Sequence, residues 1–279
     1  MPSPNKTSVT AVLAVYNGAD SLTSCLDSLL TQSFPRQIIV VDDGSTDGTL
    51  TILRRYPKIK VFKQSHGGPA QARNLGSSHA QGQILLFVDA DMTFDRNYVA
   101  TLIAPILKGK VVGTYTTEER VSNWHNIWAR CWNYQEGWED RKRFPSNPPQ
   151  YGTDFRAILK SEFDRVGGFD DIGYTDTWSL FHKLGVKPLA TRAVCYHANP
   201  ATLSAVYHQA RWSAKRPYKL GLVGTFYALL RTSLPISLVT GTVKSFKYQN
   251  PAFFLFKIVY DFGRFVGIGE MFLTHKHAK

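Results

Sequence analysis

Carboxylates follow two short apolar runs of the sequence. Asp42 and Asp43 come directly after one run, and Asp89 and Asp91 come at the end of the other. Carboxylate oxygens are the ligands that Mg²⁺ and Mn²⁺ prefer, and a bound cation offsets the charge that a leaving diphosphate acquires. The spacing of Asp89 and Asp91 therefore predicts a site for one divalent cation. Asp43 can accept a hydrogen bond from a ring N–H or from a sugar hydroxyl.

These residues need a rigid support, and the sequence around them alternates between strand and helix patterns. The expected strands are residues 9–16, 37–41, 60–63 and 84–88, and the expected helices are residues 19–32, 46–56, 68–80 and 95–108. This alternation predicts an α/β fold, with a Rossmann-like, mostly parallel sheet covered by helices on both faces. In such sheets ligands bind at the carboxyl ends of the strands, which is where the four carboxylates lie.

The middle of the chain is less regular. A strand is expected near residues 110–115, and a late strand over residues 186–197. Between them the sequence predicts an aromatic helical stretch over 121–143, a loop over 144–153, and helices over 155–166 and 175–184.

Four motifs in the first third of the chain resemble, in order, those of the family-2 glycosyltransferases with the GT-A fold. They are Ala14-Val15-Tyr16-Asn17, Val41-Asp42-Asp43-Gly44-Ser45-Thr46-Asp47-Gly48-Thr49, Gly68-Pro69-Ala70-Gln71-Ala72-Arg73-Asn74-Leu75-Gly76 and Phe87-Val88-Asp89-Ala90-Asp91. The resemblance covers roughly residues 9–200. It implies inverting transfer of a hexose from a nucleotide-diphosphate sugar, with Mn²⁺ or Mg²⁺ as the cofactor.

The resemblance also implies which residues bind the donor and the metal. The donor-binding positions are Ala14, Tyr16, Asp42, Asp43, Arg73, Asp89, Ala90 and Asp91. Asp89 and Asp91 are the metal ligands, and His197 stands where some relatives supply a third. Arg73 either meets the diphosphate or holds Asp89 in place. One of Asp42 and Asp43 contacts the nucleoside, while the other orients the turn.

Two further segments concern the acceptor. The segment that ends in Thr175-Asp176 resembles one whose last Asp is the general base of inverting members, although Thr175 replaces their Glu. Asp176 then takes the proton of the attacking hydroxyl, or caps the helix that follows, or does both. Gln209, Arg211 and Trp212 partly match the acceptor motif of cellulose-synthase-like members, which implies that they bind the acceptor sugar.

The last quarter of the chain is both basic and apolar. It contains eleven Lys or Arg residues and two acids, so it holds nine of the twelve net positive charges. Residues 220–243 are long enough to span a hydrocarbon core of about 30 Å, but Arg231 and Pro235 interrupt them. Residues 252–273 place four charges near one helical face, which favours a helix lying in a membrane interface over one crossing it.

The sequence also disfavours several classes of protein. The basic residues of the tail are interleaved with apolar runs and match no nucleic-acid module, so no nucleic-acid partner is expected. No G-x-G-x-x-G follows the first strand, which argues against a dinucleotide-dependent oxidoreductase. The three cysteines form no paired pattern. Trp124, Trp128 and Trp132 recur every four residues, so one helical face of tryptophans either packs on the body or meets lipid.

These observations predict a GT-A catalytic domain over residues 1–204 and a membrane-associating helical region over residues 205–279. Residues 1–8 are polar and lack the apolar segment of a secretory signal, so we expect the catalytic part to face the cytoplasm at a membrane. GDP-mannose is the favoured donor, with UDP-glucose possible, and a lipid-linked glycan is the favoured acceptor. The alternatives are a polyprenyl-phosphate sugar synthase, or a non-catalytic protein that binds a nucleotide sugar or nucleic acid.

Overall fold

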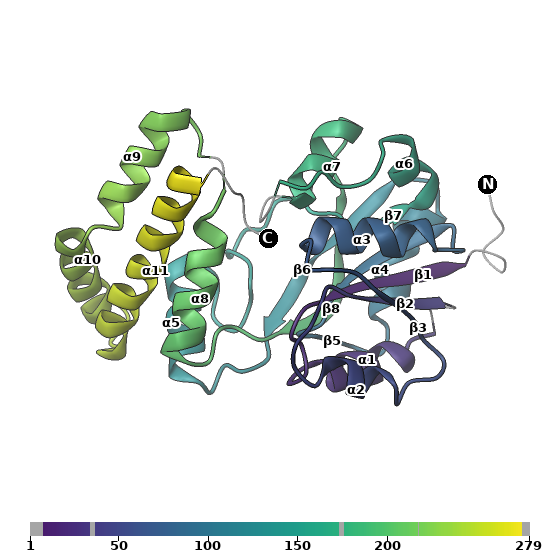
Figure 1. Ribbon diagram of the computed structural model, residues 1–279, viewed down its shortest axis with the longest axis horizontal. Coiled ribbons are helices and arrows are strands. Elements are labelled where there is room, and N and C mark those ends of the chain that lie inside the picture. Colours follow the sequence, from purple (N-terminus) through teal and green to yellow (C-terminus); the bar gives the residue numbers. More distant parts are fainter. Residues whose placement is uncertain (1–7, 34–36, 173–175, 217, 275–279) are drawn as a thin grey trace.

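The computed structural model describes residues 8–33, 37–172, 176–216 and 218–274. Its centre is one eight-stranded sheet, with strands in the spatial order β3-β2-β1-β4-β7-β6-β8-β5 (Figure 1). The strands are β1 (Val9–Val15), β2 (Gln37–Asp42), β3 (Lys60–Lys63), β4 (Ile84–Asp89), β5 (Met92–Phe94), β6 (Gly113–Val121), β7 (Ala157–Leu159) and β8 (Leu189–His197).

Four neighbouring strands, β3, β2, β1 and β4, are parallel. Their register places Val15 of β1 opposite Asp42 of β2, and Ala14 of β1 opposite Asp89 of β4. The carboxylates that end β2 and β4 therefore flank the end of β1 on its two sides. This arrangement is the one that the strand and helix alternation predicts.

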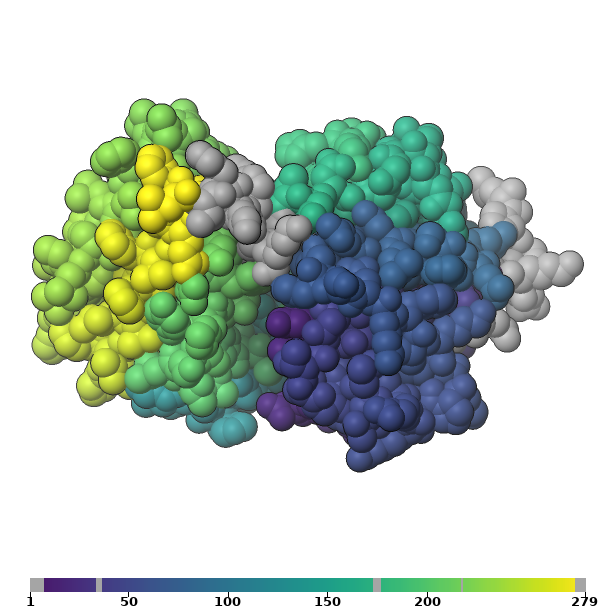
Figure 2. Space-filling view, viewed as in Figure 1, coloured from purple at the N-terminus to yellow at the C-terminus, as the bar shows by residue number. Residues whose placement is uncertain are grey.

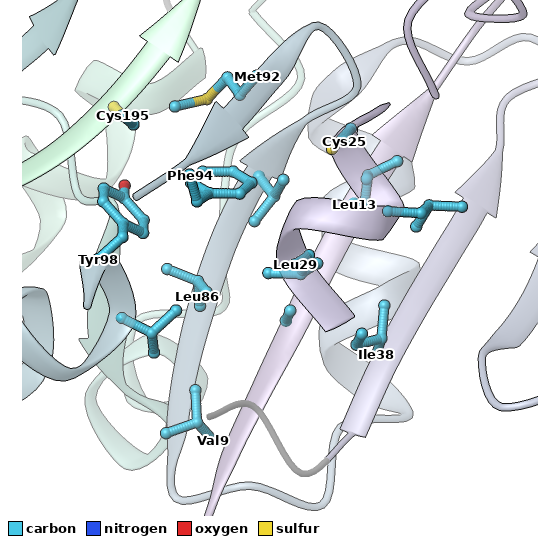
Figure 3. Packing of buried hydrophobic residues seen from close by; sticks show 14 of the residues in the cluster. Val9, Leu13, Cys25, Leu29, Ile38, Leu86, Met92, Phe94, Tyr98 and Cys195 are labelled. Atoms are coloured by element: carbon cyan, nitrogen blue, oxygen red, sulfur yellow. The ribbon is translucent and has the colours of Figure 1, made fainter. Parts of the chain in front are cut away.

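Helices cover both faces of this sheet, as predicted. They are α1 (Leu22–Leu30), α2 (Thr49–Leu53), α3 (Pro69–Ser78), α4 (Tyr98–Leu107), α6 (Lys160–Arg165) and α7 (Asp176–Leu184). On one face, α1, α2 and α4 bury residues such as Leu29 and Tyr98 against β1 and β4 (Figure 3). On the other face, α3, α6 and α7 bury Phe163 and Leu180 against the opposite side chains of the same strands. The two buried layers hold the strand ends in fixed positions.

The second half of the sheet differs from the expectation. Residues 155–166 were expected to be helical, but they form the short strand β7 followed by α6. Since β7 runs antiparallel to both β4 and β6, and β5 runs antiparallel to β8, the sheet is mixed beyond β4. Strands of three residues are too short to show an alternating pattern in the sequence, which is why both were missed. Strand β6 also extends to Val121, into the stretch expected to be helical.

Four helices complete the chain: α8 (Leu203–Ala214), α9 (Gly221–Arg231), α10 (Leu234–Lys247) and α11 (Ala252–Thr274). In Figure 1 they form a layer beside the sheet, in green and yellow, together with α5 (Ile127–Glu136). Trp132 of α5 is buried against Phe256 and Tyr260 of α11, so a segment between β6 and β7 is part of this layer. Trp124 precedes α5, so the expectation of one helix carrying all three tryptophans is wrong.

The long apolar stretch of the tail is divided into two helices. Between α9 and α10 the chain turns by 60° before Pro235, which lies in the first turn of α10. Within the described residues, neither helix alone is long and apolar enough to cross a membrane, although the bent pair passes that test together.

Candidate active site

A cavity of about 720 Å³ lies between the carboxyl ends of the parallel strands, the start of α7 and one side of α8. It brings together side chains from distant parts of the chain. Its lining is Ala14, Val15, Tyr16, Asp43, His66, Pro69, Arg73, Asp89, Asp91, Arg143, Asp154, Arg156, Thr177, Trp178, His197, Gln209, Trp212 and Arg216. The cavity thus combines charged groups of both signs with several aromatic rings, and Figure 2 shows the two parts of the molecule that border it.

Tyr16 and His66 form a stacked aromatic pair at one end of the cavity. Their ring centroids are 4.0 Å apart, and 48% of Tyr16 is exposed. Asp43 holds His66 through a 2.9 Å contact between Oδ2 and Nδ1. The same carboxylate accepts hydrogen bonds from Gln64 Nε2 and from two backbone N–H groups of the loop before α3. Because both oxygens of Asp43 are engaged, His66 and Tyr16 present the accessible surface for a planar ring.

Asp42 has a different environment. It is buried, and its Oδ1 accepts a hydrogen bond from the backbone N–H of Ser45. Asp42 therefore orients the turn after β2 and does not line the cavity, whereas Asp43 does. Ala14 lines the cavity, while Ala90 packs against the hydrophobic core behind it.

Two arginines fix Asp89 at the end of β4. Arg73 of α3 donates to Oδ1 at 2.8 Å, and Arg156 donates to Oδ2 at 2.7 Å. Burial raises the pKa of Asp89, but the charges of Arg156 and Arg73 outweigh it and hold this pKa well below its usual range. Of the two sequence-based options for Arg73, the structure shows the contact with Asp89.

Asp91 and His197 are in direct contact at the wall of the cavity. His197 Nε2 lies 2.9 Å from Asp91 Oδ2, and its Nδ1 lies 2.7 Å from Oε1 of the buried Glu119. Burial and Arg143 lower the pKa of His197, yet the carboxylates of Asp91 and Glu119 prevail and raise it to about 9. Glu119 fixes the imidazole so that Nε2 points toward Asp91.

Asp91 and His197 are side chains of the kinds that ligate divalent cations. Metal-ligating histidines usually donate their other ring N–H to a carboxylate or carbonyl, as the Nδ1 contact with Glu119 allows here. Among the described residues, no group of three or more His, Cys, Asp or Glu side chains is arranged to hold an ion alone. An ion at Asp91 and His197 would therefore need further ligands from a bound molecule, as Mg²⁺ and Mn²⁺ take from phosphates.

The predicted acceptor residues lie on α7 and α8. Asp176 begins α7, but its side chain lies outside the described part of the structure, and Thr175 lies outside it entirely. Its neighbours Thr177 and Trp178 line the cavity, as do Gln209 and Trp212. Arg211 instead binds Glu270 of α11 through two nitrogens, and it is not among the lining residues.

The sequence analysis missed several side chains of the cavity, together with the buried Glu119 that supports them. The missed lining residues are His66, Arg143, Asp154, Arg156, Thr177, Trp178 and Arg216. Arg156 carried one signal, since it is a charge directly before the apolar strand β7. Such a charge requires an ionic partner when the strand is buried. The partners could not be read from the sequence because β6, β7 and β8 pair in an order that the chain does not reveal.

Comparison with known proteins shows the family of the chain. The profile of the family described as glycosyl transferase family 2 matches residues 10–167, which is more than half of the chain. Glycosyltransferase GlyA of Streptococcus pneumoniae is 32% identical over 124 residues, or 43% of this chain and 17% of that protein. The poly-beta-1,6-N-acetyl-D-glucosamine synthase of Staphylococcus epidermidis is 26% identical over 223 residues, or 74% of this chain and 53% of that one. The chain thus matches only part of these relatives.

Solved structures share the fold. The mannosyltransferase PcManGT from Pyrobaculum calidifontis, in complex with GDP-Man and Mn²⁺, aligns with a TM-score of 0.62 at 20% identity, covering 99% of this chain and 90% of that one. S. aureus TarS 1-349 with UDP aligns with a TM-score of 0.56 at 15% identity, covering 98% and 93%. The chain belongs to glycosyl transferase family 2 and has the GT-A fold.

Proposed function

We propose that this glycosyltransferase moves a hexose, with inversion, from a nucleotide-diphosphate sugar to a hydroxyl of a lipid-linked glycan at a membrane surface. The catalytic part faces the cytoplasm in this proposal. The cavity supports it most directly: four arginines, His197 and four aspartates line one space with exposed aromatic rings at its edge. A diphosphate, a metal ion and a sugar need this combination of charges and rings.

The donor's base fits the Tyr16 and His66 pair. A purine or pyrimidine can stack on the exposed Tyr16 ring, and the edge of His66 offers a hydrogen bond beside it. GDP-mannose is the favoured donor and UDP-glucose the alternative. The neighbour PcManGT supports the first, since its structure contains GDP-Man and Mn²⁺, and TarS supports a uridine nucleotide, since its structure contains UDP.

Asp91 and His197 would hold Mn²⁺ or Mg²⁺ together with the diphosphate oxygens. When bound, the ion stabilises the negative charge of the departing diphosphate. Arg73 and Arg156 keep Asp89 ionised and oriented at the end of β4. The chain's part in the reaction is thus to position the leaving group and to supply fixed charges before the sugar departs.

The acceptor enters from the side of α7 and α8 in this proposal. Asp176 takes the proton of the attacking hydroxyl, on the anomeric face opposite the diphosphate. Trp212 stacks on the acceptor sugar, and Gln209 bonds to one of its hydroxyls. Arg211 supports this surface from behind, because its ion pair with Glu270 fixes α8 against α11.

The tail supports a lipid-linked acceptor. Exposed large apolar side chains occur along α9 and α10, among them Leu222, Phe226 and Val239, each more than 60% exposed. Contiguous apolar surface of this kind marks a membrane or protein contact. A sugar acceptor anchored in that membrane would stay close to the cavity.

The first test is transfer of label from a panel of nucleotide sugars, with Mn²⁺ or Mg²⁺, into the organic-extractable lipid of a native membrane preparation. We expect label from one donor, GDP-mannose first, and loss of that label in Asp91→Ala. Asp164→Ala is the matched control, since Asp164 pairs only with Lys160 on the surface of α6. Metal-dependent donor binding without lipid label from any donor would contradict the lipid-linked acceptor.

A further inference from the structure

The helices of the tail bury an ion pair and expose several large apolar side chains. Lys257 and Asp261 of α11 are 7% and 2% exposed and form an ion pair that also contacts Ser237 of α10. On the outer side of the same helix, Phe262 is 58% exposed and Leu273 is 81% exposed. The sequence predicts four charges near one face of a helix in the membrane interface, and the structure buries two of them, Lys257 and Asp261. Paired charges inside and apolar residues outside are typical of segments that contact lipid.

The cavity and this apolar surface meet within a short part of the chain. Trp212 and Arg216 line the cavity. Lys219 is exposed and follows three residues after Arg216, and Leu220, directly after it, is 83% exposed. From there Leu222 and the rest of α9 continue the apolar surface. Going along the chain, the surface therefore changes from sugar-binding cavity to cations to lipid-facing side chains.

A lipid-linked glycan has the same order of chemistry. Its sugars are joined through phosphate to a hydrocarbon chain, and the phosphate lies at the membrane interface when the chain is in the bilayer. Basic side chains at the rim of an apolar surface bind such phosphates. Arg211 and Lys215, which precede these two cations in the chain, form ion pairs with Glu270 of α11.

We propose that Arg216 and Lys219 bind the phosphate of a lipid-linked acceptor whose hydrocarbon chain lies in one membrane leaflet, against α9 and α10. This inference rests on the proposed function, because it gives the acceptor of that reaction a phosphate site. The 60° turn between α9 and α10 lets both helices lie along the leaflet, with Leu222, Phe226 and Val239 immersed. The cavity then opens beside the interface, within reach of a glycan whose lipid does not leave the membrane.

The test uses the full chain and vesicles, without donor or turnover. Co-sedimentation is measured with three kinds of vesicle. The first is phosphatidylcholine alone, and the second adds a minor fraction of polyprenyl phosphate. The third instead adds enough phosphatidylglycerol to give the same surface charge as the second. We expect binding to phosphatidylcholine and tighter binding with polyprenyl phosphate. The variant Arg216→Gln/Lys219→Gln should lose this increment, by about fivefold for each cation removed. Replacing Leu222 and Phe226 by Ser should weaken binding to all three vesicles.

Lys58→Gln/Lys60→Gln is the matched control, because it removes two exposed cations from the body of the sheet. This control variant should still bind more tightly to vesicles with polyprenyl phosphate than to phosphatidylcholine alone. Circular dichroism checks that each variant is folded, and Lys219→Glu alone gives a second, less disruptive test of the same site. An Arg216→Gln/Lys219→Gln protein that keeps the increment would overturn the proposal, as would an equal increment with phosphatidylglycerol. Since no sugar is transferred, these results stand apart from whether the chain transfers mannose.

Discussion

At the scale of single residues, the site depends on how buried carboxylates are neutralised. Asp89, Glu119 and Asp154 all lie near one guanidinium, that of Arg156, which is 2.7 Å from Asp89 and 3.6 Å from each of the other two carboxylates. Arginine suits this position because its planar fork can face several oxygens at once. Arg156 therefore determines where the carboxylates of the cavity point, although it is not expected to touch the reacting atoms.

Replacing Arg156 should cost stability as well as activity. In Arg156→Ala, Glu119 and Asp89 lose a partner while staying largely out of water, so the free energy of unfolding should fall by about 3–5 kcal/mol. Urea denaturation followed by tryptophan fluorescence measures this change. Arg156→Lys keeps the charge but not the planar fork, so its free energy of unfolding should lie between those of the wild type and Arg156→Ala. An unchanged midpoint in Arg156→Ala would mean that this ion network does not stabilise the fold.

Glu119 should control metal affinity without contacting the ion. Its carboxylate fixes the imidazole of His197, so Glu119→Gln should weaken Mn²⁺ binding in the presence of nucleotide about 10–100-fold. Mn²⁺ titration followed by electron paramagnetic resonance gives the affinity directly. Glu118→Gln is a neighbouring control, because Glu118 pairs with Arg120 and Lys142 on the other side of the strand. Equal affinities in the two variants would contradict the role given to Glu119.

At the scale of elements, the close approach of α8 to α11 places Gln209 and Trp212 at the cavity. Gly267 of α11 is essential to this packing, because a Cβ added there would lie 2.1 Å from the backbone oxygen of Arg211. Gly263, one turn earlier, meets the backbone of Tyr207 in the same way. Backbone atoms cannot move aside as side chains can, so a larger residue at either position must displace α8.

Gly267→Ala should therefore destabilise the protein by roughly 1–3 kcal/mol and raise the KM for the acceptor more than the KM for the donor. Gly269→Ala is the control on the same helix, since a Cβ there meets nothing within 4 Å. Alanine's higher helix propensity should make that variant equal or slightly more stable. Thermal unfolding and the two KM values measure these effects. If the two alanine variants behave alike, the packing of α8 on α11 does not position the acceptor side.

Elements differ in how far the sequence predicts them. Strands β1, β2 and β4 are apolar runs, and β2 and β4 end at carboxylates, so their positions and their shared edge were predictable. Strand β7 has three residues, and its antiparallel pairing with β4 follows from where the chain returns, which no local pattern encodes. The positions of Asp89, Asp91 and Tyr16 were predictable because these residues end or follow apolar strands that share one edge. Arg156 and Asp154 were missed because they lie next to β7, whose pairing no local pattern encodes.

At the scale of the whole molecule, the chain joins a sheet to a helical layer (Figure 1), and this layer exposes large apolar side chains along α9 and α10. The predicted boundary near residue 204 coincides with the start of α8. Yet α5 from the first part packs with α8 and α11 in one buried cluster. The catalytic half and the tail are therefore connected by a shared hydrophobic core, and the cavity lies where they meet. The sequence did not predict this connection, because no local pattern shows which buried side chains of α5 and α11 meet.

The central claim is that this cavity binds a nucleotide sugar through a metal held by Asp91 and His197. Titration calorimetry of GDP-mannose and UDP-glucose, with and without Mn²⁺, tests it directly in the wild type, Asp91→Asn and the control Asp164→Asn. We predict that one of the two donors binds, that removing Mn²⁺ weakens it at least about tenfold, and that Asp91→Asn has the same effect while Asp164→Asn has none. Donor binding that is independent of Mn²⁺ and unchanged in Asp91→Asn would contradict the claim.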